Sequence, residues 1–285
     1  MSQERRPPQP TAQALPSASA IARRRALIAR AAEKVKPLDA VRRVARMDRD
    51  EFRRFAAEGQ PLIIEGIVGS WPISTFKRQD LGRRFGELRV YPRVGDYIPH
   101  AVSTGPGSHG MSLAQYLKLT ERDSGGVPLY VGDHPLPAAS LCTWPEYFER
   151  WNTPRVWLGP AGTVTPLHCD FEDNLFAQVL GRKRFLLYSP AVADALHPDD
   201  VNPLLSVSRF DPERPNYVRF PLAESAKAIV CDLAPGDLLY LPAGWFHHVR
   251  ALEFSLSVNR WTPDDPGVIA TVGKGEINDR VGNSS

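Results

Sequence analysis

Short apolar runs separated by glycine and proline fill the second half of the chain. Residues 183–189 and 237–241 show the pattern: they are rich in Leu, Phe and Tyr and are bounded by polar or turn-forming residues. Many such runs without intervening helical patterns indicate a β-sandwich or a β-barrel. The strands are expected at 155–159, 166–170, 174–180, 183–189, 229–232, 237–241, 246–250 and 253–260.

The first half of the chain mixes helical and extended patterns. Residues 48–57 begin with a capping aspartate and end near Gly59, which predicts a helix, and the apolar residues 61–65 predict a buried strand. Residues 93–110 are rich in Gly, Pro and Ser and predict an exposed loop. Residues 197–225 predict a long irregular insertion, which is typical of a lid or a substrate-facing surface. Further helices are expected at 79–85 and 112–118, and further strands at 88–92 and 127–131.

The N-terminal segment is basic. Residues 1–18 are rich in Pro, Gln and Ser and are expected to be disordered, whereas residues 19–36 can form a helix with Leu27 and Ile28 on one side. Its arginines can be interpreted as an arm that binds nucleic acid, but a solvated helix packed on the domain or on a second subunit of a homodimer is favoured. The chain is therefore expected to consist of a basic segment at 1–40, one domain at 41–262 and a tail at 263–285.

Composition limits the partners and the compartment. A net charge of +3 over 285 residues is too small to argue for a nucleic-acid partner. No run of about 18 apolar residues occurs, so no membrane span is expected. The three cysteines are scattered and lack CxxC spacing, which indicates reduced thiols and a cytoplasmic location.

His168 and Asp170 are the first candidates for chemistry. They are two residues apart on an expected strand, so both side chains point to the same face. With a second histidine they form the facial triad that holds non-haem Fe(II) and leaves the opposite positions open for a cosubstrate and dioxygen. The candidates for that histidine are His247 and His248. A lone His-x-Asp pair is weak evidence for a metal site, so the interpretation depends on the residues around it.

Those surroundings resemble a known family. The segments that carry the resemblance are 157–170 (WLGPAGTVTPLHCD), 178–184 (QVLGRKR), 235–242 (PGDLLYLP) and 245–248 (WFHH). Together they resemble the metal strand, the cosubstrate strand and the second-histidine turn of the JmjC-type, cupin-like 2-oxoglutarate-dependent oxygenases. The single-domain hydroxylases of this family include factor inhibiting HIF and the JmjC arginyl hydroxylases. The resemblance implies a double-stranded β-helix, a jelly-roll or cupin barrel, with flanking N-terminal helices.

The resemblance also implies the ligands of the metal. His168, Asp170 and His247 match the three iron ligands of the family. In the family the first histidine of a Trp-aromatic-His-His run binds the metal. Adjacent residues on a strand face opposite ways, so only one of His247 and His248 can face the iron.

The cosubstrate residues are implied in the same way. Lys183 matches the lysine that pairs with the distal carboxylate of 2-oxoglutarate, and Thr165 and Tyr130 match hydroxyls that assist it. Asn174 and Asn259 match residues near the metal-bound end. A dicarboxylate needs a cation at its far end, which an ammonium on a strand can supply.

The resemblance implies an oxygenase that uses Fe(II), 2-oxoglutarate and O2. The expected reaction is hydroxylation of a side chain of a protein or peptide, with succinate and carbon dioxide as coproducts. Several alternatives stay open: demethylation of methyl-lysine, action on a tRNA base or a small natural product, a metal-only cupin enzyme without 2-oxoglutarate, and a non-catalytic binding module.

Overall fold

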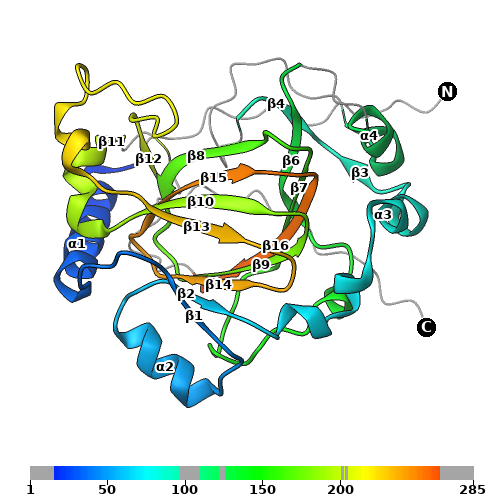
Figure 1. Ribbon diagram of the computed structural model, residues 1–285, viewed down its shortest axis with the longest axis horizontal. Coiled ribbons are helices and arrows are strands. Elements are labelled where there is room, and N and C mark those ends of the chain that lie inside the picture. Colours follow the sequence, from blue (N-terminus) through cyan, green and yellow to red (C-terminus); the bar gives the residue numbers. More distant parts are fainter. Residues whose placement is uncertain (1–15, 97–109, 122–125, 200–201, 203–204, 264–285) are drawn as a thin grey trace.

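The computed structural model describes residues 16–96, 110–121, 126–199, 202 and 205–263 (Figure 1). Three expectations therefore lie wholly or mostly outside the described residues: the disorder of 1–18, most of the loop at 93–110 and the tail at 263–285.

Two mainly antiparallel sheets form the body of the protein, and the predicted double-stranded β-helix is confirmed (Figure 1). Within the described residues, the larger sheet has the order β1-β2-β14-β9-β16-β7-β6-β4 and the smaller one β11-β12-β8-β15-β10-β13, while β3 pairs with β5. The strands of the larger sheet are β1 (Arg42–Val44), β2 (Leu62–Ile64), β4 (Arg93–Val94), β6 (Leu129–Pro135), β7 (Arg155–Gly159), β9 (Asn174–Leu180), β14 (Leu238–Leu241) and β16 (Ser255–Trp261). The others are β3 (Arg89–Val90), β5 (Met111–Ser112), β8 (Val164–Cys169), β10 (Lys183–Tyr188), β11 (Pro198–Asp199), β12 (Ser206–Ser208), β13 (Ile229–Leu233) and β15 (Phe246–Ala251).

Apolar side chains from both sheets meet between them. Phe176 of β9 and Phe185 of β10 pack edge to face, with ring centroids 5.1 Å apart. Leu187, Leu239 and Val249 belong to the same buried cluster. Because successive side chains on a strand face opposite ways, alternate residues of each strand fill this inter-sheet core and the residues between them point outward.

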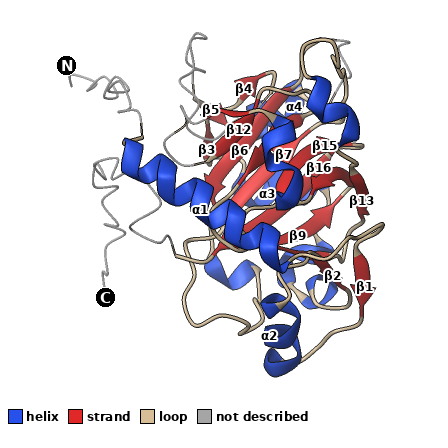
Figure 2. Cartoon of the chain, turned by 90° about the vertical axis from the view of Figure 1, so that its left-hand side faces the viewer, coloured by secondary structure: helices blue, strands red, loops and turns tan. Residues whose placement is uncertain are grey.

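The outward-facing side chains are covered by helices. Phe52, Leu81 and Tyr116 of α2, α3 and α4 share one cluster with Leu175 and Tyr240 of the larger sheet. Leu167 of β8, Tyr188 of β10 and Phe246 of β15 share another cluster with Ile28 of α1 and with residues of the short helices η4 and η5. Helix α1 lies at one end of the strands of the smaller sheet, the end that faces the viewer in Figure 2. The helices are α1 (Ala18–Lys34), α2 (Arg49–Ala57), α3 (Arg78–Phe85), α4 (Leu113–Leu119), η1 (Val68–Ser70), η2 (Pro72–Thr75), η3 (Ala139–Leu141), η4 (Pro190–Leu196) and η5 (Pro221–Ser225).

Local signals account for where two of the helices begin. The Asp48 side chain accepts a hydrogen bond from the Glu51 amide, and the Glu51 side chain accepts one from the Asp48 amide, so α2 starts with a capping box. Ser112 and Gln115 form the same reciprocal pair at the start of α4. These side chains satisfy amide groups that have no partner inside the helix, which fixes the helix starts near the predicted positions.

Three local expectations are wrong. The insertion at 197–225 is not wholly irregular, because β11 and β12 extend the smaller sheet and Val207 pairs with His168. Arg93 and Val94, expected in a loop, form β4, and the strand expected at 127–131 runs from 129 to 135. Strands of two or three residues are too short to show a period-two pattern in the sequence. Whether they form depends on the strand with which they pair.

Helix α1 is fixed to the barrel by a buried arginine. Arg24 is 1% exposed, and its Nη1 donates a hydrogen bond of 2.7 Å to the carbonyl of Asn202. Its guanidinium lies 4.9 Å from the centre of the Phe171 ring, and Phe171 directly follows Asp170. The helix therefore packs on the domain, but this arginine is not solvated.

We expect Arg24→Ala to lower the free energy of unfolding by about 2–4 kcal/mol, because a buried carbonyl loses a charged donor and Phe171 loses a cation–π contact. Urea unfolding followed by circular dichroism measures this. The control is Arg30→Ala, an exposed arginine of the same helix, which should stay within about 0.5 kcal/mol of wild type. Equal stability of the two variants would show that Arg24 does not hold α1 to the barrel.

The structure also bears on two expectations from composition, namely reduced cysteines and the lack of a membrane-spanning segment. Cys142, Cys169 and Cys231 are buried and form no disulfide. Burial raises the pKa of Cys142 and of Cys231 to about 12, so these thiols stay protonated near neutral pH. In the part of the chain that is described, no helix has the length and apolar character needed to span a membrane.

Candidate functional site

Two neighbouring strands bring His168 and His247 together. β8 and β15 are antiparallel, and His247 pairs directly with His168. Directly opposed residues point to the same face, and the two imidazole rings lie 4.0 Å apart. Asp170 follows the last residue of β8, and each of its carboxylate oxygens lies 3.9 Å from the Nε2 of one histidine. The three side chains are buried.

The hydrogen bonds of the histidines fix which ring nitrogen faces Asp170. His168 Nδ1 lies 2.7 Å from the carbonyl oxygen of Pro166, and His247 Nδ1 lies 3.2 Å from that of Trp245. A carbonyl only accepts, so each Nδ1 carries a proton and each Nε2 is the nitrogen that faces Asp170. Burial, and then the neighbouring His168, lower the pKa of His247, so its imidazole is neutral near neutral pH.

These three residues fit a metal ion. One ligand atom from each of His168, Asp170 and His247 lies within 4.8 Å of the others. Imidazoles held by carbonyl groups at Nδ1, together with one carboxylate, are the arrangement expected of a transition-metal site. Ligands that come from one side only leave the opposite side open for a substrate.

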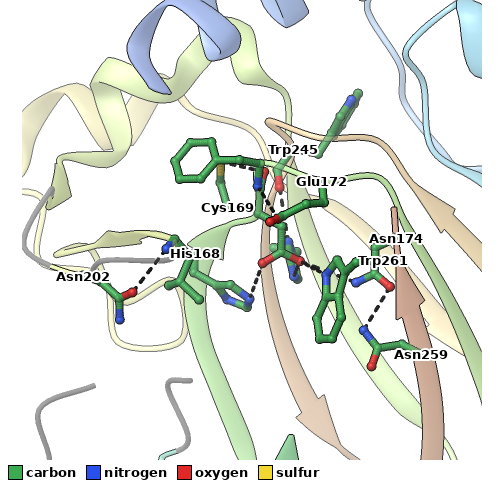
Figure 3. Close-up of polar contacts among 12 residues, drawn as sticks. His168, Cys169, Glu172, Asn174, Asn202, Trp245, Asn259 and Trp261 are labelled. Atoms are coloured by element: carbon green, nitrogen blue, oxygen red, sulfur yellow. Dashed lines mark hydrogen bonds and ion pairs between the residues drawn. The ribbon is translucent and has the colours of Figure 1, made fainter. Parts of the chain in front are cut away.

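A chain of polar side chains holds the Asp170 carboxylate. The indole nitrogen of Trp261 donates to Asp170 Oδ2 over 2.9 Å, and Asn174 Nδ2 lies 3.5 Å from the same oxygen (Figure 3). Asn259 Nδ2 in turn donates to Asn174 Oδ1 over 3.0 Å, and Trp157 Nε1 donates to Asn259 Oδ1 over 2.8 Å. The structure thus places Asn174 and Asn259 beside the candidate ligand, connected to the inter-sheet core.

Lys183 is a buried amine on the same face. Leu187 of β10 lies opposite His247, and Lys183 is four residues before it, so both face inward. Lys183 is 1% exposed, and its Nζ donates to the Tyr130 hydroxyl over 3.2 Å. Among the described residues no carboxylate forms an ion pair with it. Burial lowers its pKa to about 7.

A bulge in β8 turns Thr165 to the side of the histidines. Thr165 pairs with Val249 and His168 pairs with His247, so three residues of β8 span the same length as two of β15. Val249 belongs to the inter-sheet core, which places Thr165 on the inner face as well. Without the bulge, Thr165 and His168 would point to opposite faces because their spacing is odd.

His248 points away from this group. Its Nε2 lies 3.9 Å from Glu213, on the segment that follows β12, and its Nδ1 is buried without a hydrogen-bond partner among the described residues. The structure therefore groups His247, and not His248, with His168 and Asp170.

Comparison with known proteins agrees with this geometry. Residues 48–266 match the family described as Cupin-like domain. The chain belongs to this family. Its similarity to JmjC proteins places it among the JmjC-type oxygenases, which use Fe(II), 2-oxoglutarate and O2.

The relatives differ in their named substrates. Lysine-specific demethylase 8 of Xenopus tropicalis is 32% identical over 230 residues, which cover 74% of this chain and 50% of that protein. Jumonji C domain-containing protein 5 of Drosophila melanogaster is 43% identical over 236 residues, covering 74% and 57%. tRNA wybutosine-synthesizing protein 5 of Gallus gallus is 36% identical over 117 residues, covering 40% and 36%. The chain thus spans only about half of the length of the first two relatives.

Several groups around the site were not expected from the sequence. The residue type of Trp261 suggests only core packing, yet its indole holds Asp170. The carbonyl oxygens that orient the histidines belong to the main chain at Pro166 and Trp245, which no sequence pattern marks. A tryptophan that closes the strand after the second histidine is the one signal that could have pointed to this contact.

Proposed function

We propose that the protein is an Fe(II)- and 2-oxoglutarate-dependent hydroxylase that acts on a side chain of a protein or peptide. The observation that carries the proposal is Lys183. An amine that is buried, inward-facing and without a carboxylate partner in the described part of the chain destabilises the free protein unless a bound anion compensates it. It lies on the same face as a three-residue group that can hold a metal ion.

In this proposal His168, Asp170 and His247 hold Fe(II). Bound there, the ion supplies the activation of dioxygen by which 2-oxoglutarate is oxidised to succinate and carbon dioxide and one oxygen atom enters a C–H bond. The chain itself orients both imidazoles through the Pro166 and Trp245 carbonyls, so that each Nε2 faces Asp170. Trp261 donates a hydrogen bond to the carboxylate and limits its rotation.

The same proposal assigns 2-oxoglutarate to the inner face of β10. Lys183 pairs with its distal carboxylate, and the hydroxyls of Tyr130 and Thr165 donate to the same group. The burial of all three side chains excludes water, which strengthens these contacts. Asn174 and Asn259 lie at the other end, next to Asp170.

Relatives support a protein side chain as the substrate. Lysine-specific demethylase 8 is named for action on lysine, and this relative aligns with 74% of the chain. The relative named for tRNA wybutosine synthesis aligns with only 40%. Hydroxylation and demethylation share the insertion of oxygen into a C–H bond, and they differ in whether the product then loses formaldehyde.

Mass spectrometry of peptides, tRNA and small molecules from cells with and without the gene tests the substrate class. We expect peptides that gain one oxygen atom in the presence of the gene, and no gain when the gene encodes Asp170→Ala. Loss of a methylene with release of formaldehyde would establish demethylation instead. A change confined to tRNA or to small molecules would refute a protein substrate.

The affinity for 2-oxoglutarate is expected to fall about tenfold per pH unit above pH 7. The pKa of Lys183 is about 7 in the free protein, so above that pH the amine must take up a proton to pair with a carboxylate. Below pH 7 it is already charged, and this contribution is constant. Calorimetry with the Mn(II)-loaded protein, without oxygen, measures the profile. Lys183→Met should bind weakly at every pH, and a flat profile for wild type would contradict the prediction.

A further inference from the structure

The loop after β8 and the turn before β15 are joined by one carboxylate. Asp173 lies three residues after Asp170, and its Oδ1 accepts a hydrogen bond of 2.9 Å from the amide of Ala243. The Tyr240 hydroxyl donates to the same carboxylate. Tyr240 and Ala243 lie on either side of the residue pair 241–242, so Asp173 holds the turn that leads into β15 at two points.

Main-chain contacts tie the same loop to the turn and to β16. The Gly244 amide donates to the Asp170 carbonyl over 2.9 Å. The Asp173 amide donates to Thr262 Oγ1 over 3.1 Å, and the Thr262 amide returns a bond of 2.9 Å to the Asp173 carbonyl. Thr262 follows Trp261, which holds the Asp170 carboxylate. Asp173 thus lies where the segments that carry or contact Asp170 and His247 converge.

The nearest cation to act on the Asp173 carboxylate is Lys34, which attracts it electrostatically without forming an ion pair. The carboxylate is mostly buried, it forms no ion pair among the described residues, and its two donors are an amide and a phenol. Burial raises its pKa, although these hydrogen bonds oppose the shift. What this position supplies to the turn is therefore a hydrogen-bond acceptor, because an acceptor satisfies the partly buried Ala243 amide whether or not it is charged.

We propose that Asp173 is a positioning residue that holds the turn at Ala243 and Gly244 against the loop of Asp170 and thereby sets the spacing between Asp170 and His247. The inference rests on the proposed function in one respect, namely that these two residues and His168 hold the ion. Outer groups that orient ligands commonly change metal affinity by about 10- to 100-fold when removed.

Asp237 provides a matched control at the opposite end of β14. Its Oδ2 accepts a hydrogen bond of 2.8 Å from the Ala234 amide, so it closes a turn in the same way. It is buried, and it pairs with Arg43. It contacts neither the loop of Asp170 nor the turn before β15, so its removal should cost stability without changing the metal site.

The first experiment compares Asp173→Ala, Asp173→Asn and Asp237→Ala. Each protein is titrated anaerobically with Fe(II) and with Mn(II), and calorimetry measures the affinity for the metal. We expect Asp173→Ala to weaken metal binding about 10- to 100-fold and Asp237→Ala to change it less than roughly threefold, while both lower the melting temperature. Asp173→Asn keeps the acceptor for Ala243 and should recover most of the affinity. Metal affinity unchanged in Asp173→Ala would overturn the proposal, as would an asparagine variant as weak as the alanine variant.

The second experiment does not depend on the metal. Hydrogen–deuterium exchange of the metal-free proteins should show faster exchange over residues 242–247 in Asp173→Ala than in Asp173→Asn or Asp237→Ala, because the turn has lost its anchor. Equal exchange in all three would overturn the proposal. If wild type bound no metal but the turn still loosened in Asp173→Ala, the proposed function would fail while the positioning of the turn stood.

Discussion

Replacing Asp170 or His247 with alanine is expected to reduce 2-oxoglutarate turnover to less than about one thousandth of wild type, a loss of roughly 4 kcal/mol or more of transition-state stabilisation. Either change removes one of three ligand atoms that lie within 4.8 Å of one another. Succinate release under saturating Fe(II) and 2-oxoglutarate measures the loss. Metal titration of the same variants shows whether it follows from weakened iron binding.

The matched control is His248→Ala. His248 is adjacent to His247 and equally buried, but it faces Glu213 on the other side of the strand. We expect this variant to keep turnover within about tenfold of wild type, because only packing behind the site is lost. If His248→Ala were inactive and His247→Ala active, the register of β15 against β8 would be wrong by one residue.

Removing the buried amine is expected to be the second large effect. Lys183→Ala should raise the concentration of 2-oxoglutarate needed for half-maximal turnover by about ten- to several-hundredfold, since a charge-assisted hydrogen bond contributes on the order of 1.5–3 kcal/mol and more if its loss leaves a buried charge unpaired. Iron affinity should not change, because Lys183 is not among the candidate ligands. Titration of 2-oxoglutarate with succinate as the readout measures the shift.

Two further variants make this result specific. Thr165→Val removes a neutral donor at nearly constant volume and should show a weaker form of the same defect.

Lys183→Met should leave the ligand-free protein at least as stable as wild type. The folded-state pKa of Lys183 is lowered, so near neutral pH the unfolded chain binds more protons and the lysine opposes folding. If Lys183→Ala needed the same concentration of 2-oxoglutarate as wild type for half-maximal turnover, a metal-only cupin enzyme would be favoured.

The residues of the site were predictable because their spacing follows the geometry of a strand. His168 and Asp170 share parity, and Lys183 opens an apolar strand with an inward-facing position, so alternation alone aims them correctly. The choice of His247 over His248 came from the family motif, since alternation says only that one of the two faces inward.

The surroundings of the site were less predictable because they depend on contacts between distant segments. The short β12, which pairs with the end of β8, was expected to be irregular. Arg24 was expected in solvent, yet it is buried against Phe171 because α1 packs on η4 and on the segment that follows β8. Trp261 contacts Asp170 across 91 positions of sequence, a distance over which no local pattern carries information.

The mainly β class, the candidate metal ligands and the inward-facing lysine could be predicted from the sequence, because each depends on the period of a strand or on the chemistry of a side chain. Three other features arise only from tertiary contacts: the bulge that brings Thr165 to the side of His168, the carbonyl groups that orient the two imidazoles, and the anchoring of the turn at Ala243 by Asp173. These depend on register and on main-chain hydrogen bonds between strands, which form only when the whole barrel closes.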